Sequence, residues 1–495
     1  MMQKNDRELL KTAYRCHVQP ERSKGTPATQ LSVAKKLASD TCVSLYLHIP
    51  FCVQKCRYCD FLSGPSDAGT RTRYLYALAA ELTETGELIW EQMREYDAAS
   101  GQGQETLDLQ RESAGKPWQA QGGRRLPVDT VFIGGGTPSV LRPDELEILL
   151  QTIRQRYDLR PDAEITMECN PGTAGLEQLR AFCKLGVNRI SIGVQSFQDE
   201  ELQLLGRIHT AQQARDCVQN ARKAGFANVS LDLMSGLPGQ SYETWMENLQ
   251  EAVRLSPEHI SAYSLILEEG TAFWNMQERG ELPPFPDDEL DRRMYHDTLR
   301  FLEQHGYHRY EISNYAREGC ESRHNSGYWT GHPYLGFGVG AASYLGGYRW
   351  SHTRDLVRYC ESLERCAAEK ACSCAAAGTG NECAAGTERN DGKDCTAAGS
   401  RKTSRRSEES GILQDAEQLT RQDQMAEFMF LGLRRMEGVS EELFRERFGV
   451  SMEEVYGKVL KRYTELGLLN RGKGKVALTE QGIDVSNGIM ADFLM

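Results

Sequence analysis

Short apolar runs rich in β-branched residues alternate with amphipathic stretches through the middle of the chain, from residue 43 to residue 265. A run of about four to eight apolar residues between turn residues is typical of a buried strand, and apolar residues spaced three and four apart are typical of a helix. Strands are therefore expected at Val43–Ile49, Thr130–Ile133, Glu164–Met167, Arg189–Val194, Asn228–Leu233 and His259–Leu265. Helices are expected between them at Asp144–Arg156, Leu176–Leu185, Ala211–Ala224 and Tyr242–Leu255, with Thr173, Thr210 and Ser241 as caps.

The alternation of strands with helices predicts an α/β fold with a parallel sheet and right-handed crossovers. Six such units make a complete barrel or an arc of one, a partial (β/α)6 barrel, and both bind ligands at the carboxyl ends of the strands. Unusual polar and glycine-rich elements follow the strands in order: a cysteine-containing loop, Gly134–Pro138, Glu168–Pro171, Gln195–Phe197 and Asp232. We therefore expect one site at this edge of the sheet.

The pattern after residue 412 is that of a small helical domain. The expected elements are an amphipathic helix, two capped helices, a hairpin around a glycine-rich turn and a last helix: Gln418–Arg435, Glu441–Arg447 behind Ser440, Met452–Leu466 behind Ser451, residues 467–476, and a helix opened by Thr479. Three helices followed by a hairpin predict a C-terminal helical, winged-helix-like domain.

Two segments, 95–127 and 366–412, break this pattern and are interpreted as insertions. The second is rich in Ala, Gly, Ser, Lys and Arg, and it contains Cys366, Cys372, Cys374, Cys383 and Cys395. These cysteines are either a metal site or incidental residues of a low-complexity segment. The second interpretation is preferred because no ordered scaffold is predicted around them.

Composition narrows the class of protein. The 495-residue chain has a net charge of −12 at pH 7, which argues against binding to nucleic acid, since such proteins carry a basic face. No apolar run approaches the ~20 residues that span a bilayer, and the first residues lack the apolar core of a signal peptide. A cytoplasmic protein is expected. In a reducing compartment, the fifteen cysteines favour metal ligation over disulfides.

Three cysteines with the spacing Cys-x3-Cys-x2-Cys follow the first expected strand: Cys52, Cys56 and Cys59. Thiolate is the ligand that iron–sulfur clusters take. Three thiolates on one tight loop can hold three irons of a [4Fe-4S] cube and leave the fourth iron free to chelate the amino and carboxylate groups of S-adenosylmethionine (SAM). The alternative is a structural zinc site, completed by His48 or by a distant cysteine, because zinc takes four closed ligands.

The glycine-rich element and four polar residues are candidates for binding SAM. Glycine has no Cβ, so Gly134–Pro138 would let the backbone approach the methionine moiety, although an ordinary strand-to-helix turn would look the same. Glu168, Gln195, Arg207 and Asp232 lie at or just beyond strand ends. A carboxylate accepts from ribose hydroxyls, and an amide or a guanidinium binds carboxylate or ribose oxygens. A helix cap or a surface ion pair is the alternative for each.

With these motifs the chain resembles the oxygen-independent coproporphyrinogen oxidase superfamily of radical SAM proteins. The resemblance covers residues from about Ser44 to the end, outside both insertions, and rests on Tyr46–Cys52, Gly134–Ser139, Ser191–Phe197, Leu231–Pro238 and Tyr310–Tyr315. It implies that Cys52, Cys56 and Cys59 hold the cluster. It also implies SAM contacts at the matching positions, which are Tyr46, Gly135, Gly136, Thr137, Glu168, Gln195, Arg207 and Asp232.

Within this superfamily the chain is similar to the heme chaperone branch. The oxidase branch carries a fourth cysteine where this chain has Phe61, and the chaperone branch carries a His-Asn-x-x-Tyr-Trp element. The resemblance implies that this element contacts heme, with or without covalent attachment, through His324, Asn325, Tyr328 and Trp329. Imidazole ligates heme iron and aromatic rings pack on the macrocycle. The alternatives are a hydrogen-bonded core histidine at 324 and an iron ligand at His332 or Cys320.

The predicted function is a heme chaperone that binds a [4Fe-4S] cluster, SAM and heme. The alternatives are an oxygen-independent oxidase that decarboxylates coproporphyrinogen III through a 5′-deoxyadenosyl radical, and a non-catalytic binding module with a vestigial cluster site. The resemblance implies heme and heme-accepting respiratory apoproteins as partners, with at most peripheral membrane association. The expected organisation is an N-terminal extension, the barrel with its insertion, a heme-contact and connecting region, the second insertion and the winged-helix-like domain: 1–42, 43–315 with 95–127, 316–365, 366–412 and 413–495.

Overall fold

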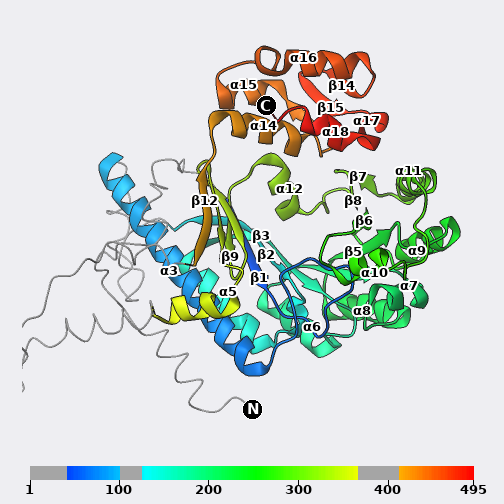
Figure 1. Cartoon of the computed structure of the whole chain (residues 1–495). Helices are drawn as coiled ribbons and strands as arrows, with labels where there is room; N and C mark the ends of the chain where they lie inside the picture. The colour runs from blue at the N-terminus through cyan, green and yellow to red at the C-terminus, as the bar shows by residue number, and fades with distance from the viewer. Residues whose placement is uncertain (1–41, 101–124, 366–411, 495) are drawn as a thin grey trace, which may run out of the picture.

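A curved sheet of 12 strands forms the centre of the molecule, and helices cover its outer face (Figure 1). The structure is a computed structural model that describes residues 42–100, 125–365 and 412–494. The strands lie in the order β12-β11-β10-β9-β1-β2-β3-β4-β5-β6-β8-β7. The fold is the expected α/β architecture, an open barrel of six parallel strands with further strands on both sides.

The six expected strands are all present and pair in parallel in chain order. Their bounds are β1 Val43–Ile49, β2 Pro127–Gly135, β3 Asp158–Cys169, β4 Arg189–Gln195, β5 Asn228–Ser235 and β6 His259–Ser264. β2 and β3 start earlier than their apolar runs, because Pro127 pairs with Asp158 and Val128 with Leu159. Pairing with a neighbour therefore extends a strand into residues that have no apolar signal of their own.

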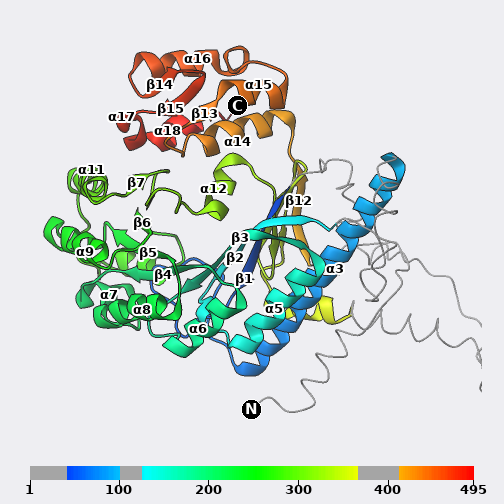
Figure 2. The ribbon, with the colours of Figure 1, turned by 180° about the vertical axis from the view of Figure 1, so that it is seen from behind.

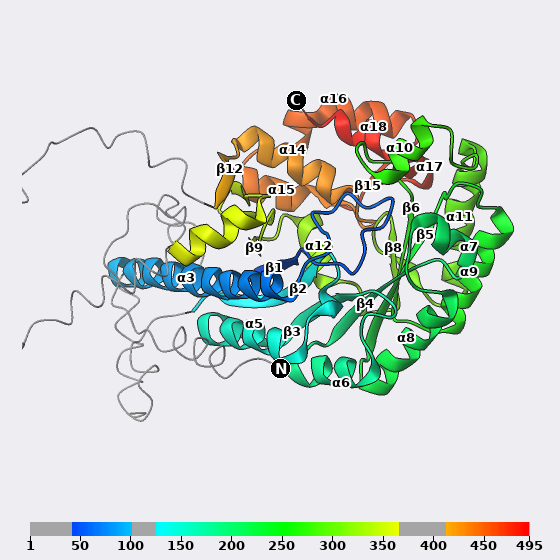
Figure 3. The same cartoon turned by 60° about the horizontal axis from the view of Figure 1, so that its bottom comes forward.

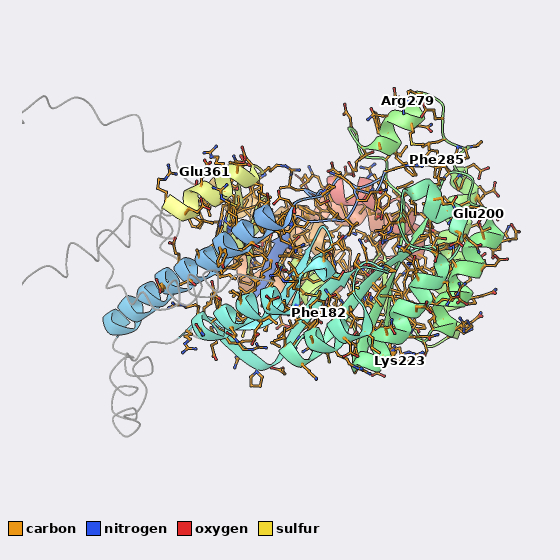
Figure 4. All side chains as sticks on the ribbon, turned by 90° about the horizontal axis from the view of Figure 1, so that it is seen from below. Phe182, Glu200, Lys223, Arg279, Phe285 and Glu361 are labelled. Carbon is orange, nitrogen blue, oxygen red and sulfur yellow. The ribbon has the colours of Figure 1, made fainter. Side chains whose placement is uncertain are left out.

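Most helices between the strands pack against the convex face of the sheet: α3 Ala68–Ser100, α5 Pro143–Arg156, α6 Leu176–Leu185, α7 Asp199–Leu205, α8 Ala211–Ala224, α9 Tyr242–Arg254 and α11 Asp288–Gln304. The short η2 Pro138–Val140 and α10 Ala272–Glu278 lie instead at the mouth of the barrel, where the backbone nitrogen of Phe273 in α10 donates to the Arg57 carbonyl. Phe182 of α6 is buried against the sheet and Lys223 of α8 is exposed to solvent (Figure 4). Each helix thus buries its apolar stripe, as the sequence pattern predicts.

Of the three helix caps expected in the barrel, two are confirmed, and the caps Ser440, Ser451 and Thr479 of the C-terminal domain are confirmed as well. The hydroxyls of Thr210 and Ser241 accept hydrogen bonds from the backbone nitrogens of Gln213 and Thr244. The expectation for Thr173 is wrong, because Gly175 precedes α6 and makes no side-chain cap. The Thr173 hydroxyl instead donates to the carbonyl oxygen of Asn170 at 2.6 Å. It closes the turn after β3 rather than opening the helix.

The sheet extends beyond β1 and β6, and this extension corrects the expected organisation. On one side lie β9 Tyr334–Phe337, β10 Ala342–Leu345, β11 Tyr348–His352 and β12 Leu413–Gln418; on the other lie β8 Asn314–Ala316 and β7 His308–Arg309. β9 runs parallel to β1 and satisfies its open edge, with Ser44 opposite Tyr334. Much of the expected connecting region 316–365 is therefore sheet, and residues 413–418, assigned to the last domain, are sheet as well.

The first insertion is shorter than expected. α3 continues to Ser100, because residues 91–100 are mostly good helix formers such as Glu, Met, Arg and Ala, and β2 already begins at Pro127. The residues outside the described ranges are 1–41, 101–124, 366–411 and 495. The N-terminal extension, most of both insertions and the five clustered cysteines lie there.

The C-terminal domain has the expected helices and hairpin. Its elements are α14 Arg421–Gly432, β13 Val439–Ser440, α15 Glu441–Phe448, α16 Met452–Glu465, β14 Leu469–Gly472, β15 Lys475–Leu478, α17 Glu480–Asp484 and α18 Ser486–Ala491. The three strands form a small sheet in the order β13-β15-β14. The domain has its own apolar core, which includes Met429, Phe444 and Tyr456. Helix α12, Arg323–Thr330, lies between this domain and the large sheet (Figure 2).

Candidate functional site

The cysteine loop, residues 50–64, leaves β1 at the mouth of the barrel beside α10 (Figure 3). The backbone nitrogen of Cys52 donates to the Gly64 carbonyl at 3.0 Å, which closes the base of the loop. Arg57 fixes its tip, since its backbone nitrogen donates to Leu205 and its carbonyl accepts from Phe273. The thiols of Cys52, Cys56 and Cys59 are free and partly buried. Packing against α7 and α10 thus holds all three thiols on one anchored loop.

The structure argues against a zinc site at this loop. His48 is unavailable as a ligand, because its Nε2 donates to the Leu62 carbonyl at 2.9 Å and its Nδ1 accepts from the Tyr46 hydroxyl at 2.9 Å. Within residues 42–100, 125–365 and 412–494, no three His, Cys, Asp or Glu side chains could hold one metal ion. A four-iron cube instead takes its thiolates on separate irons. Three thiols spread along one loop fit that donor arrangement better than the closed tetrahedron of zinc.

The glycine-rich element lies directly against the cysteine loop. Backbone nitrogens of Gly136 and Thr137 donate to the carbonyls of Ile49 and Phe51, each at 2.8 Å. A Cβ on Gly136 would stand 2.8 Å from the Phe51 carbonyl oxygen and 3.0 Å from the Cys52 sulfur. The sequence suggested that this glycine makes room for SAM. In the structure, it already makes room for the cysteine loop itself.

Arg207 and Asn170 connect two of the cysteines. Arg207 donates to the Cys56 sulfur at 3.5 Å and to the Asn170 side-chain oxygen at 2.9 Å. Asn170 in turn donates to the Thr137 hydroxyl at 2.9 Å, and that hydroxyl donates to the Cys52 sulfur at 3.3 Å. The guanidinium of Arg207 and the hydroxyl of Thr137 therefore both lie against sulfur atoms of the loop. Asn170 is absent from the predicted site residues, although its place directly after the third strand could have revealed it.

Two carboxyl groups face the barrel from β3 and β5, the strands on either side of β4. Glu168 accepts from the Gly135 nitrogen at 2.9 Å, and Asp232 accepts from the Ser191 hydroxyl at 3.1 Å. Burial raises the pKa of Glu168 to about 7, and the nearby charge of Asp232 adds to the effect. Burial also raises the pKa of Asp232. Carboxylate oxygens accept more than one hydrogen bond, so both groups can also bind hydroxyl or ammonium donors of a ligand.

Gln195 and Tyr46 complete the predicted SAM residues. Gln195 has a left-handed backbone with φ of 65°, which is uncommon for a residue with a side chain and occurs often at binding sites. Its side-chain oxygen accepts from the Tyr263 hydroxyl at 2.9 Å. Tyr46 lies on the inner face of β1, bonded to His48 and stacked on Phe132 at 6.2 Å. The eight predicted positions therefore lie inside one barrel, on the side of the carboxyl ends of its strands.

The pKa of Glu168 gives a prediction for Glu168→Gln. In the ligand-free protein, the folded state keeps the Glu168 proton up to about pH 7, whereas the unfolded chain loses it near pH 4.5. The free energy of unfolding therefore falls as the pH rises through this window, by up to about 3 kcal/mol. Glu168→Gln should be more stable than the parent at pH 8 and equally stable near pH 4 in urea unfolding. Exposed Glu147→Gln is the control, and a pH-independent difference for Glu168→Gln would contradict the assignment.

The His-Asn-x-x-Tyr-Trp element lies at the other end of the barrel, on α12. His324 is 1% exposed; its Nδ1 bonds the Thr130 hydroxyl at 2.8 Å and its Nε2 bonds the Tyr328 hydroxyl at 3.0 Å. The ring also stacks on Phe132 at 5.0 Å, and burial lowers the pKa of His324 to about 3. Both nitrogens are thus engaged in the barrel core. This is the geometry of the hydrogen-bonded core histidine that the sequence left open as an alternative.

The other members of the element have separate surroundings. The backbone nitrogen of Asn325 donates to the Ser322 cap at 3.3 Å, while Trp329 lines a cavity next to the C-terminal domain. Of the alternative iron ligands, His332 lies 3.4 Å from Asp129, and Cys320 has a free thiol whose pKa burial raises. The structure therefore brings the predicted cluster and SAM residues together. His324 lies one ring away from Tyr46, because Phe132 stacks on both side chains, whereas Trp329 lines the cavity beside the C-terminal domain.

Two family models match the chain: the radical SAM superfamily over residues 119–252 and the HemN C-terminal domain over residues 419–485. The protein named "Heme chaperone HemW" in Bacillus subtilis strain 168 is 33% identical over 452 residues, 91% of this chain and 99% of the relative. The chain belongs to the HemW family. HemW of Escherichia coli K12 is 39% identical over 302 residues, which is 60% of this chain and 69% of that protein.

HemW membership agrees with the shape of the molecule. The solved structure of coproporphyrinogen III oxidase (HemN) from Escherichia coli matches with a TM-score of 0.70 and 19% identity over 98% of both chains. At this identity, the likeness establishes the fold and not the activity. Membership of the radical SAM superfamily implies a [4Fe-4S] cluster and SAM.

Proposed function

We propose that the chain is a heme chaperone, which binds a [4Fe-4S] cluster, SAM and heme and delivers heme to respiratory apoproteins. The main support for the proposal is the sequence similarity of this chain to a protein named "Heme chaperone HemW", which extends over 99% of that protein. Retention of heme and its transfer are the defining activities of such a protein.

The cluster is assigned to Cys52, Cys56 and Cys59, and SAM is assigned to the inside of the barrel near the carboxyl ends of its strands. When bound, the cluster supplies an iron that can chelate the amino and carboxylate groups of SAM. The residues proposed to hold SAM are Tyr46, Gly135, Gly136, Thr137, Glu168, Gln195, Arg207 and Asp232. Support comes from the bonds that already join Thr137 to Cys52 and Arg207 to Cys56, since they place both side chains beside the thiols.

One observation on the cysteine loop favours a chaperone over an oxidase. Phe61 occupies the position at which the oxidase branch has a fourth cysteine, and its side chain is 66% exposed. An exposed phenyl ring offers neither a metal ligand nor a proton to a reaction.

Of the four proposed heme residues, Trp329 has the most suitable surroundings, because it lines a cavity. His324 and Tyr328 are bonded to each other in the barrel core, so ligation of iron by His324 requires this bond to open. We therefore assign heme contact first to the Trp329 side of α12, with Asn325 on the same helix. His332 and Cys320 are the alternative iron ligands.

Delivery to respiratory proteins would require contact with a membrane or with a protein in it. None of the helices within residues 42–100, 125–365 and 412–494 combines the length and the apolar character needed to cross a bilayer. Contact with a membrane acceptor would therefore use the surface of these described parts without inserting one of their helices.

A single reconstituted sample distinguishes chaperone from oxidase. We expect stoichiometric heme binding, followed by Soret absorbance, and no conversion of coproporphyrinogen III when the cluster is reduced and SAM is present. Apoprotein of a respiratory cytochrome should then withdraw the heme, measured by separating donor and acceptor. Multiple-turnover formation of protoporphyrinogen would replace the proposal with the oxidase, and absence of heme binding would refute the chaperone.

A further inference from the structure

A cavity of about 190 Å³ lies between α12, β10 and the C-terminal domain. It is far from the cysteine loop, because α12 contacts the amino ends of the barrel strands, where His324 bonds Thr130 and the Ser44 nitrogen donates to Pro333. Its walls are largely apolar and aromatic, with contributions from both domains: Trp329, Tyr344, Phe428, Leu431, Val439 and Leu443. Ligand sites commonly form at such domain interfaces.

The rim of this cavity carries an excess of positive charge. Three cations, Arg435, Arg447 and Lys475, face two carboxylates, Glu427 and Glu437. Glu427 is paired with Arg349 at 2.8 Å, outside the lining, whereas Glu437 is shared between Arg435 and Lys475. Arg435, Arg447 and Lys475 carry three positive charges against the one negative charge of Glu437, which leaves two positive charges in excess.

Arg447 is the cation best placed to meet an anion. It donates to the Tyr344 hydroxyl at 3.2 Å, and within the described residues no carboxylate lies within ion-pair distance of it. Gly331 gives it room, because a Cβ there would stand 3.3 Å from the Arg447 guanidinium. The indole nitrogen of Trp329, on the same cavity wall, is buried and has no hydrogen-bond partner among the described residues. Buried donors without partners are uncommon in native proteins and call for an explanation.

The dimensions limit what can enter. Pockets that enclose a drug-sized ligand measure about 300–1,000 Å³, so a whole tetrapyrrole does not fit into this cavity. One pyrrole ring with its propionate is small enough. Its flat apolar ring would match Trp329 and Phe428, and its carboxylate would match Arg447.

We infer that this cavity is the subsite for the propionate edge of heme, with Arg447 as the residue that binds the carboxylate. The inference rests on the proposed function, because heme is the cargo that such a chaperone carries. It deepens that function by giving the heme a place on this chain that is distinct from His324 and opposite to the cluster.

The test compares Arg447→Gln with the parent in the full-length protein, using heme and heme dimethyl ester as probes. The ester keeps the macrocycle and the iron but has no carboxylates. A charge-assisted hydrogen bond lost on substitution should weaken binding of heme by about tenfold or more. Binding of the ester, titrated by Soret absorbance, should be equal in parent and variant. Arg445→Gln is the matched control, because Arg445 is exposed on the same helix and does not line the cavity.

The outcomes separate this inference from the proposed function. Heme affinity unchanged in Arg447→Gln, or an equal loss for heme and its ester, would overturn the propionate subsite while leaving the chaperone intact. Absence of heme binding by the parent would overturn both. Arg447→Lys provides a second check, because it keeps the charge without the planar fork and should retain part of the preference for heme over its ester.

Discussion

Replacing Cys52, Cys56 or Cys59 with alanine is expected to remove most of the iron from anaerobically reconstituted protein. The parent should carry about four irons per chain, because three thiolates ligate a cube with one open iron. Each thiol is free and partly buried on a loop that backbone bonds hold on both sides. The fold should survive, since these side chains contribute no part of the apolar core. Iron and acid-labile sulfide analysis together with circular dichroism measures both effects.

The control for this experiment is Cys183→Ala. Cys183 is also a free, partly buried cysteine, but it lies on α6, away from the loop. The Cys183→Ala variant should bind the full amount of iron. Stoichiometric zinc in the anaerobically prepared parent, or full iron content in any of the three loop variants, would show that the cluster assignment is wrong.

Gly136→Ala should abolish cluster binding even though it changes no ligand. The new methyl group would stand 2.8 Å from the Phe51 carbonyl oxygen, 3.0 Å from the Ile49 carbonyl oxygen and 3.0 Å from the Cys52 sulfur. Two of these atoms are backbone, so the loop must move as a whole to relieve the contact. We expect loss of most of the iron and a destabilisation of about 1–3 kcal/mol, the usual cost of overpacking.

Gly64→Ala provides the matched control for this variant. Gly64 belongs to the same loop, yet a Cβ there would have no neighbour within 4 Å. It should retain both iron and stability in urea unfolding. If Gly136→Ala bound iron as well as Gly64→Ala, close packing of the glycine element on the loop would not be what positions Cys52.

The central strands could be predicted because each carries a local signal. β1, α6 and α8 have the bounds that their apolar periodicity predicts, and the cysteine loop follows β1 as expected. The strands β9 to β12 could not be found in this way. They are short, and β12 exposes most of its residues, so they exist because β1 offers an open edge. Pairing between segments far apart in the sequence leaves no periodic pattern in either one.

The same contrast between local patterns and long-range contacts applies to the candidate site. Residue types in the right order were enough to place Glu168 and Gln195 at strand ends. Asp232 lies inside β5, which continues to Ser235. The role of Asn170 could not be recognised, because it depends on bonds to Thr137 and Arg207. The side chains that surround His324 could not be predicted from the sequence either. Its partners Thr130 and Phe132 come from a strand almost 200 residues earlier in the chain. A motif reveals which residues occur together in sequence, but not which of them face the same space.

The position of α12 affects how cargo could pass through the molecule. The backbone nitrogens of Arg323 and His324 donate to Glu164, so the helix is anchored at the amino ends of the strands, while the cysteine loop lies beyond their carboxyl ends. An electron donor approaching the cluster and an apoprotein collecting heme would therefore contact opposite poles of the protein. Neither would have to leave before the other arrives, and both could be bound within a single ternary complex.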